Sequence, residues 1–308
     1  MSVENKDRLP KVVGLVLTFN DFQNTIKCLN SVRASDYDCF DVYLVDNCSE
    51  YQILQQIKEQ NSNLQIISVP ENRGYSGGFN YAIKWLISRQ IEFDYVWLVT
   101  NDLEVACDSL GIQVRLMNEN DSIGFLGPET FKRDGCGQHD QWITYLKDDS
   151  NPAQISLGEK FETKGLDLID VEFVVGHCML IRKSTILEVG LMRDFFLYYE
   201  EREWQWRAKK LNWRRCVAPG SLCFHDRDSF GKPLNTFYRI RNLVYFNRIL
   251  LKEKSLRHFL FFRNLSSEFY GGLRLFFINQ YTFKHLAFFI FGFIVGVFRK
   301  IPSINRVL

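Results

Sequence analysis

The stretch YVWLVTNDLEV, Tyr95–Val105, starts as a buried strand and ends in polar side chains that could carry chemistry. β-Branched and aromatic residues fill Tyr95–Val99, as is typical of a central strand. Open α/β sheets bind ligands at the edge where such strands end, and Mg²⁺ takes one or two carboxylates together with phosphates and water. The residues alone leave two hypotheses open. Either Asp102 binds a divalent cation, or Asp102 and Glu104 cap the next helix.

Strands and helices are predicted to alternate before this stretch. Apolar runs predict strands at Val12–Thr18, Asp41–Val45 and Leu64–Val69. Helical spacing predicts helices over Phe22–Arg33 and Tyr51–Glu59, and a third that opens in the glycine-rich segment Glu71–Asn80. This alternation favours βαβ units, and therefore a mostly parallel sheet flanked by helices.

The second half is predicted less regularly. Residues 128–170 are polar, and we expect a long irregular insertion that covers a site. Further elements are expected in this order: a strand over Val171–Arg182 interrupted at Gly176-His177, a helix over Glu200–Leu211, a strand over Trp213–Ala218, and helices from Asn235 onward that include 255–278 and 281–299.

The net charge of +2 hides a division of the chain. Residues 227–308 carry 14 Lys or Arg against 3 Asp or Glu, whereas residues 1–226 carry a net charge of −9. A basic segment indicates a surface that meets anions. Its many Phe residues favour a lipid interface over nucleic acid.

Several protein classes are disfavoured. The 8 Cys residues form no C-x-x-C pair and read as small buried side chains of a reduced compartment. The N-terminal sequence MSVENKDRLP has no apolar core typical of a signal peptide. The apolar run Leu286–Phe298 is shorter than the roughly 20 residues of an ordinary membrane span. A P-loop is absent, and no G-x-G-x-x-G follows the first strand.

Five polar landmarks stand at predicted strand ends or helix starts. They are Asp46, Arg73, Asp102, the Glu200-Glu201 pair and His225. Each has a simpler interpretation, since Asp-Asn favours turns, charge runs are usually solvated, and an isolated His is more often structural than a ligand. They gain weight together, because the strand ends of one parallel sheet share one edge.

In order along the chain, the segments VVGLVLTFND, YLVDNCS, ENRGYSGGFNYAI, WLVTNDLEV and GHCMLIRKSTILEVGLMRDFFLYYEEREWQWRAKKLNWR resemble family 2 glycosyltransferases of the GT-A fold. The resemblance spans about residues 10–250 and is nearest in character to the rhamnosyl- and galactofuranosyltransferase-like branch, which YRIRNLVYFNR at 238–248 also resembles. It implies inverting transfer of a sugar from a nucleotide-sugar, with Mg²⁺ or Mn²⁺ as cofactor.

The resemblance also implies roles for individual residues. Glu201 falls on the catalytic base and is expected to stay ionised at its helix start, while Asp102 and His225 fall on metal ligands. Asp46 would bind a pyrimidine base. The other expected donor-binding residues are Thr18, Phe19, Asn72, Arg73, Gly77, Gly78, Asn101 and Asp102, and the expected acceptor-binding residues are Gly176, His177 and Glu200.

Two positions depart from the family pattern. Thr100 stands where the first acid of the D-x-D motif is expected, so Asp102 would be the one direct carboxylate ligand from that motif unless Glu104 assists. Glu201 stands where Asp is commoner, and its extra methylene requires a small shift of the backbone or of the acceptor.

We therefore expect a catalytic domain over residues 1–234, with a nucleotide-binding half at about 10–105 and an acceptor half at about 106–234, followed by amphipathic helices over 235–308. The expected protein transfers a sugar from a UDP- or dTDP-sugar to a glycan or lipid-linked acceptor. It would be cytoplasmic and peripheral on the inner face of the cell membrane, with no nucleic-acid partner, and a homodimer is an alternative use of the helices. The rival hypotheses are a non-catalytic nucleotide- or glycan-binding subunit and a sugar nucleotidyltransferase.

Overall fold

The computed structural model describes residues 8–132, 167–225, 232–253, 258–277 and 282–307. The first part of the chain alternates strands and helices as predicted. Its elements are β1 (Val12–Thr18), α1 (Phe22–Arg33), β2 (Phe40–Asp46), α2 (Tyr51–Gln60), β3 (Gln65–Ser68), α3 (Gly74–Ser88) and β4 (Tyr95–Thr100). The strands pair in parallel in the order β3-β2-β1-β4.

The second part extends the same sheet in a mixed direction. Its elements are β5 (Leu103–Val105), α4 (Ser109–Glu119), β6 (Ile123–Lys132), β7 (Ile169–Asp170), β8 (Cys178–Arg182), α5 (Lys183–Val189), α6 (Glu200–Lys210) and β9 (Arg214–His225). The order continues β4-β8-β6-β9-β5, with β7 beside β9. Because β8 is antiparallel to both β4 and β6, and β9 is parallel to β6, β9 runs in the same direction as β4 and ends at the same edge.

Two expectations for this part were wrong, and one open alternative is excluded. Glu104 does not cap a helix, because it lies in β5 and pairs with Phe224. The irregular insertion was expected from residue 128, but β6 continues to Lys132; residues 133–166 lie outside the described part. The strand predicted over Val171–Arg182 forms only from Cys178.

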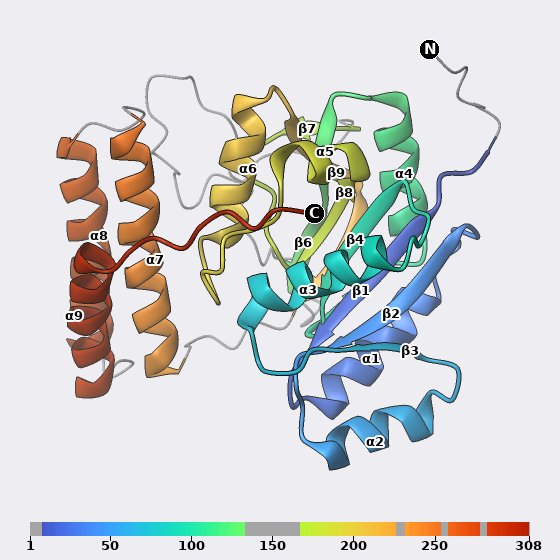
Figure 1. Cartoon of the computed structure of the whole chain (residues 1–308), viewed down its shortest axis with the longest axis horizontal. Helices are drawn as coiled ribbons and strands as arrows, with labels where there is room; N and C mark the ends of the chain where they lie inside the picture. The colour runs from blue at the N-terminus through green and yellow to red at the C-terminus, as the bar shows by residue number, and fades with distance from the viewer. Residues whose placement is uncertain (1–7, 133–166, 226–231, 254–257, 278–281, 308) are drawn as a thin grey trace.

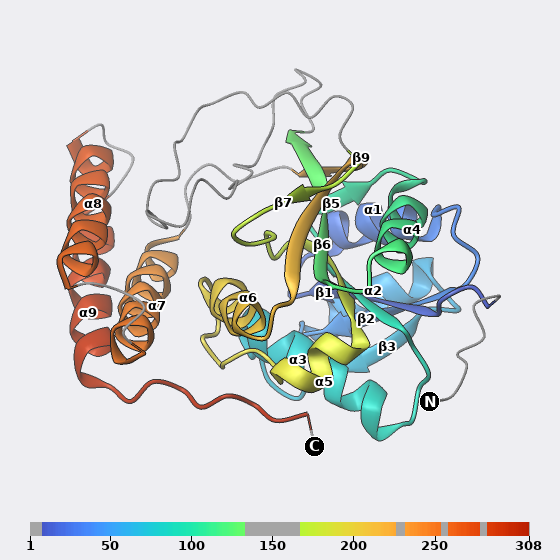
Figure 2. The ribbon, with the colours of Figure 1, turned by 90° about the horizontal axis from the view of Figure 1, so that it is seen from above.

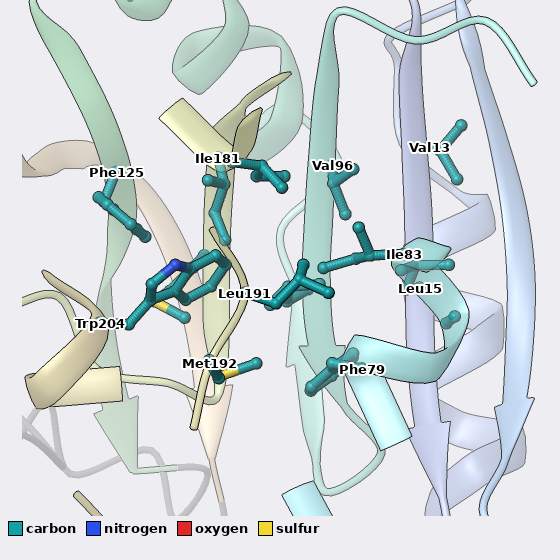
Figure 3. Packing of buried hydrophobic residues seen from close by; sticks show 14 of the residues in the cluster. Val13, Leu15, Phe79, Ile83, Val96, Phe125, Ile181, Leu191, Met192 and Trp204 are labelled. Carbon is teal, nitrogen blue, oxygen red and sulfur yellow. The ribbon is translucent and has the colours of Figure 1, made fainter. Parts of the chain in front are cut away.

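Two apolar layers bury the sheet. Alternate residues of β1 point to opposite faces, with Val13 and Leu15 in one layer and Val12 and Val16 in the other. Helices α3, α5 and α6 cover the first face and α1, α2 and α4 the second, as Figure 2 shows for α3 and α5 against α1 and α4. In the first layer the indole of Trp204 packs edge-on against Phe125 (Figure 3). Strands buried on both faces read as continuous apolar runs, which is why β1 and β4 were predictable.

The C-terminal helices are α7 (Pro233–Lys252), α8 (His258–Phe277) and α9 (Phe283–Phe298), which stand together at one side of the sheet (Figures 1 and 2). Helix α9 lies against α7 through two small residues. A Cβ at Gly292 would come within 2.6 Å of the Phe237 carbonyl oxygen, and one at Gly296 within 2.8 Å of Val244. Among the described helices, none has the length and apolar character needed to cross a membrane.

The segment after α9 returns to the sheet-bearing body. The Leu191 amide donates to the Asn305 carbonyl over 3.0 Å, and Arg193 pairs with Ile304 in an isolated bridge. Arg193 also donates through Nη1 to the carbonyl of Pro302 over 2.6 Å. These contacts tie the end of the helical region to the loop that precedes α6.

Candidate active site

The carboxyl ends of the parallel strands bring the first group of predicted residues together. Thr18 is the register partner of Asp46, and Leu17 is the partner of Thr100, so the segments after β1, β2 and β4 start side by side. Thr18 also reaches the β4 end through Thr25, whose hydroxyl lies 2.7 Å from the hydroxyl of Thr18 and 3.0 Å from Nδ2 of Asn101. The expectation of one shared edge is confirmed for these strands.

Asn47 links the end of β2 to the start of α3 at this edge, and it was not among the residues expected in the site. Its Nδ2 donates to Oδ1 of Asn72 and to the Gly74 carbonyl, each over 3.0 Å, and its Oδ1 accepts from the Arg73 amide over 3.0 Å. Neighbouring Asp46 is buried and accepts the Ser49 amide over 3.0 Å. The Asp-Asn sequence after a strand was the only available signal, and it pointed to Asp46 or to a turn but not to Asn47.

The remaining predicted donor residues differ in exposure. Phe19 is 45% exposed beyond the end of β1. Arg73 forms an exposed ion pair with Glu71. Gly77 and Gly78 are buried, and a Cβ would meet Arg73 at 2.5 Å in the first case and Leu17 at 2.7 Å in the second. The side chain of Arg73, the N-cap of α3, therefore accounts for Gly77, and close packing of α3 on β1 accounts for Gly78, both without a ligand.

The segment Gly74–Gly78, GYSGG, also has the G-x-S-x-G spacing of a hydrolase nucleophile elbow. In such an elbow the serine hydroxyl is exposed at a sharp strand-to-helix turn. Here Ser76 is fully buried, and its hydroxyl accepts the Phe196 amide over 3.1 Å. The serine thus holds a loop in place and is not a nucleophile.

Asp102 and His225 meet where β4 and β9 end. Nε2 of His225 lies 3.1 Å from Oδ2 of Asp102, and the Thr100 hydroxyl donates to Oδ1 over 2.5 Å. Burial by itself raises the pKa of Asp102, but the hydrogen bonds from His225 and Thr100 outweigh it and lower that pKa to about 2. The Asp102 side chain remains 44% exposed, so an ionised carboxylate is available to a ligand at this edge.

The ligand atoms of Asp102 and His225 are spaced as a divalent cation requires. Adjacent ligands of an octahedral ion bound at about 2.1 Å stand about 3 Å apart, which matches the separation of Asp102 Oδ2 and His225 Nε2. One carboxylate and one imidazole suit Mn²⁺, with water and phosphate completing the shell. Within the described ranges, no three His, Cys, Asp or Glu side chains gather as a metal-binding group, so the protein itself supplies at most this pair there.

His177 links this pair to the start of α6. Its ring stacks on His225 with centroids 5.1 Å apart, its Nε2 lies 2.9 Å from the Thr130 hydroxyl, and its carbonyl accepts the Thr100 amide over 2.8 Å. The preceding residue, Gly176, lies beside Glu201. A Cβ built on Gly176 would lie 3.5 Å from the Cβ of Glu201. Four predicted residues, His225, His177, Gly176 and Glu201, thus follow one another in space.

The glutamates at the start of α6 carry strongly perturbed carboxyl groups. Burial raises the pKa of Glu200 well above its ordinary value, and the charge of Glu201 raises it further. Burial also raises the pKa of Glu201, although the charges of Arg202 and His177 oppose the shift. The helix start was expected to keep Glu201 ionised, and burial outweighs that effect. Oε2 of Glu200 is buried without a hydrogen-bond partner in the described structure.

Comparisons with known proteins agree with this architecture. The sequence pattern of Glycosyl transferase family 2 matches residues 15–190. A curated relative, the low-salt glycan biosynthesis hexosyltransferase Agl10 of Haloferax volcanii, is 25% identical over 170 residues, which cover 55% of this chain and 53% of the relative. The chain therefore spans about half the length of the curated relative it matches.

Solved structures show the fold. The mannosyltransferase PcManGT from Pyrobaculum calidifontis, in complex with GDP-Man and Mn²⁺, has a TM-score of 0.56 at 14% identity and covers 96% of this chain and 89% of its own. GalNAc-T7 with UDP, GalNAc and Mn²⁺ has a TM-score of 0.57 at 13% identity, and the match covers 78% of this chain and 48% of GalNAc-T7. The sheet and its flanking helices are accordingly the GT-A fold that the sequence predicted.

Proposed function

The chain belongs to glycosyl transferase family 2, and from that premise we propose that it transfers a hexose, with inversion, from a nucleotide-sugar to a hydroxyl of a glycan or lipid-linked acceptor. The observation that carries the proposal is the contact of Asp102 with His225 at the sheet edge, reached from Glu201 through Gly176 and His177. In this proposal the leaving-group site and the base share one edge of the sheet, on opposite faces of the bound sugar, as a single inverting displacement requires.

The donor would lie across the ends of β1, β2 and β4. A carboxylate such as Asp46 accepts a hydrogen bond from N3–H of uracil or thymine, and this favours a UDP- or dTDP-sugar. Exposed Phe19 offers a face for the base, and Arg73 a cation near the diphosphate. The finer assignment to rhamnose, galactofuranose or galactose donors rests on the sequence resemblance alone.

Asp102 and His225 would hold Mg²⁺ or Mn²⁺. The ion would stabilise the negative charge that develops on the nucleoside diphosphate as it leaves. The low pKa of Asp102 keeps its carboxylate ionised for this task at any physiological pH.

Glu201 would act as the base. Its carboxylate takes the proton of the acceptor hydroxyl while the acceptor oxygen bonds to the anomeric carbon and the bond to the diphosphate oxygen breaks. Burial raises the pKa of Glu201, which makes the carboxylate a stronger proton acceptor. Glu200, whose pKa is raised further, would take up a proton first and leave Glu201 as the ionised member of the pair.

A membrane surface is the proposed location of the acceptor. Helix α9 exposes an apolar face at helical spacing, formed by Phe283, Ile290, Phe291, Ile294 and Phe298. The exposed cations Lys284, Arg299 and Lys300 flank it, and residues 227–308 carry 14 basic against 3 acidic residues. An apolar face between cations suits the surface of an anionic bilayer, and we therefore place the protein on the inner face of the cell membrane.

A donor screen tests the proposed function. Nucleotide release would be measured with UDP-galactose, UDP-galactofuranose, dTDP-rhamnose, UDP-glucose and UDP-N-acetylglucosamine, each with Mn²⁺ and with EDTA. We expect metal-dependent release from at least one donor. Tight donor binding without release in the presence of acceptor extracts would instead identify a non-catalytic binding subunit.

A further inference from the structure

Three aromatic residues directly before Glu200 have left-handed backbones. Phe196, Tyr198 and Tyr199 have φ of 71°, 70° and 70°. Bulky residues adopt this conformation rarely, and they keep it only where surrounding contacts hold it. We call Phe195–Tyr199 the aromatic turn, and it sets the direction in which α6 and its first two glutamates leave the sheet.

Asn242 of α7 holds the aromatic turn from one side. The side chain is fully buried, and its Nδ2 lies within hydrogen-bond distance of three carbonyl oxygens, those of Phe195 at 2.9 Å, Leu197 at 2.8 Å and Tyr198 at 3.0 Å. One amide therefore collects the carbonyl groups that the left-handed backbone turns inward. A shorter side chain, or one without N–H groups, would leave these carbonyls without that partner.

Arg241 fixes the orientation of this amide. Its Nε donates to Oδ1 of Asn242 over 2.9 Å, and its Nη2 donates to the Phe195 carbonyl over 2.6 Å. The guanidinium also lies near the rings of Tyr238 and Tyr245, with its carbon 4.9 Å and 5.5 Å from their centroids. Since Oδ1 is held by a donor, Nδ2 must face the aromatic turn.

The start of α3 holds the same turn from the other side. The Phe196 carbonyl accepts the Tyr75 amide over 2.7 Å, and the Phe196 amide donates to the Ser76 hydroxyl over 3.1 Å. Gly74, with φ of +65°, allows this approach, because a Cβ there would lie 2.1 Å from the Phe196 carbonyl oxygen. The turn thus sits between the donor side of the site and α7.

We propose that Asn242, oriented by Arg241, is a positioning residue that holds the aromatic turn so that Glu201 faces Gly176 and His177. This rests on the proposed function, in which Glu201 is the base. It means that α7 completes the active site and does more than carry the helices that follow it. Neither residue touches the reacting atoms. The positive charge of Arg241 also acts on Glu200, but Arg241→Lys keeps that charge, so an effect shared by the Asn242 and Arg241 variants passes through the turn.

A matched control lies on the same helix. Asn247 is also buried, but its Nδ2 donates to the Leu243 carbonyl one turn back and not to a carbonyl of the aromatic turn. Asn242→Asp and Asn247→Asp remove the same N–H groups from the same buried helix. A loss that follows from weakening α7 would appear in both variants, whereas a loss of positioning would appear only in Asn242→Asp.

The experiment compares both variants, and Arg241→Lys, with the unaltered full chain. Amide hydrogen exchange would be followed in peptides covering the aromatic turn and the start of α6, with β1 peptides as the reference. Turnover and donor affinity would be measured by nucleotide release and calorimetry with the donor found by the screen. We expect faster exchange of the turn and at least a tenfold lower kcat in Asn242→Asp, with donor Kd changed less than about threefold. Arg241→Lys should also speed the exchange of the turn and lower kcat, whereas Asn247→Asp should change neither the exchange nor kcat.

Unchanged exchange of the turn in both Asn242→Asp and Arg241→Lys would overturn the proposal whatever the activity. The proposal would also be overturned if Asn242→Asp showed faster exchange of the turn but the same kcat as Asn247→Asp. If Asn242→Asp does not fold, Arg241→Lys decides in the same two measurements. An unaltered chain that releases no nucleotide from any donor refutes the proposed function separately, and the exchange comparison then decides alone whether Asn242 holds the turn.

Discussion

Asp102 shows how a few neighbours decide the chemistry of one residue. Burial opposes its ionisation, yet two hydrogen bonds reverse the effect and bring its pKa to about 2. One of these bonds comes from Thr100, the residue that replaces the first acid of the expected motif. The hydroxyl cannot add a second negative charge, but it orients the carboxylate that remains. The loss of one acid is therefore compatible with an ordered site.

Replacing Asp102 with Asn tests its role as a ligand. The variant keeps the shape of the side chain and loses the charge, so we expect a turnover lower by about two decades or more. The chain should still fold, with a lower melting temperature, because the hydrogen bonds from His225 and Thr100 lose their charged acceptor. Nucleotide release with Mn²⁺ and a thermal melt measure the two quantities. Asp108→Asn is the control, because Asp108 is exposed at the start of α4 and makes no capping hydrogen bond. Full activity of Asp102→Asn, or of the unaltered chain in EDTA, would remove the metal from the mechanism.

Glu201→Gln tests the base. Since the lost interaction belongs to the transition state, we expect transfer to disappear while donor affinity stays within about twofold. Calorimetry with the donor and transfer assays separate the two. If donor binding weakens and kcat is retained, Glu201 is not the base and Glu200 becomes the better candidate.

The same assignment predicts a pH dependence. A base works in its deprotonated form, and burial raises the pKa of Glu201. The rate of transfer should therefore fall as the pH decreases through a value above the ordinary glutamate pKa of about 4.3, and be constant above it until another group titrates. A pH profile of kcat at saturating donor measures this limb, and a rate that stays constant down to a pH of about 4.3 would contradict the assignment.

At the scale of elements, prediction from sequence worked where a strand or helix has a strong local pattern of its own. The buried strands β1 and β4 are continuous apolar runs, and α1 and α6 carry their own periodicity and end signals, so their existence and nearly all of their bounds were predictable. By contrast, β6 and β9 depend on pairing over long sequence separations, and β6 continues through polar residues that read as a loop. A strand was predicted where β8 lies, but no local feature of the sequence indicates that it inserts between β4 and β6 in the antiparallel direction.

The candidate site divides in the same way. Asp102, Glu201 and His225 could be named because strand ends and a family pattern identify them. Asn47 and Asn242 could not, because an asparagine that satisfies carbonyls of a distant segment looks like any other asparagine in the sequence. Their partners are fixed by the tertiary structure, in particular by the left-handed turn before α6.

The contact between α7 and α9 provides an element-scale test. Gly292→Ala places a Cβ 2.6 Å from a backbone oxygen of Phe237, and overpacking of this kind costs about 1–3 kcal/mol. That cost should exceed the gain of about 1 kcal/mol from replacing a helical glycine. We expect a lower melting temperature and faster proteolysis of the C-terminal helices.

Gly271 of α8 supplies the control for this substitution. Apart from its chain neighbours and the backbone of its own helix, no atom among the described residues lies within 4 Å of a Cβ built on it. Gly271→Ala should therefore leave stability unchanged or raise it slightly, through helix propensity alone. Equal melting temperatures for both variants would show that α9 does not pack on α7 as closely as the structure indicates.

For the whole molecule, the open question is what meets the apolar face of α9. Phe283 and Phe298 are 77% and 80% exposed at its two ends, and a face of this kind usually marks an interaction surface. The chain after α9 is hydrogen-bonded to the loop before α6, where Arg193 donates to the Pro302 carbonyl and the Leu191 amide donates to the Asn305 carbonyl. A membrane bound to that face would therefore hold the catalytic edge at a fixed distance from lipid-linked acceptors.

Flotation with liposomes tests this arrangement. The full chain should float with vesicles containing anionic lipid at low salt and much less at high salt, since each basic residue near the surface contributes roughly 1 kcal/mol that salt screens. The double substitution Phe283→Glu and Phe298→Glu should abolish flotation, because it places two charges in the apolar contact. Leu187→Glu, at an exposed leucine of α5, should not. A chain that never floats but sediments as a dimer, and becomes monomeric with the double substitution, would assign the face to a second copy and leave the acceptor without a membrane requirement.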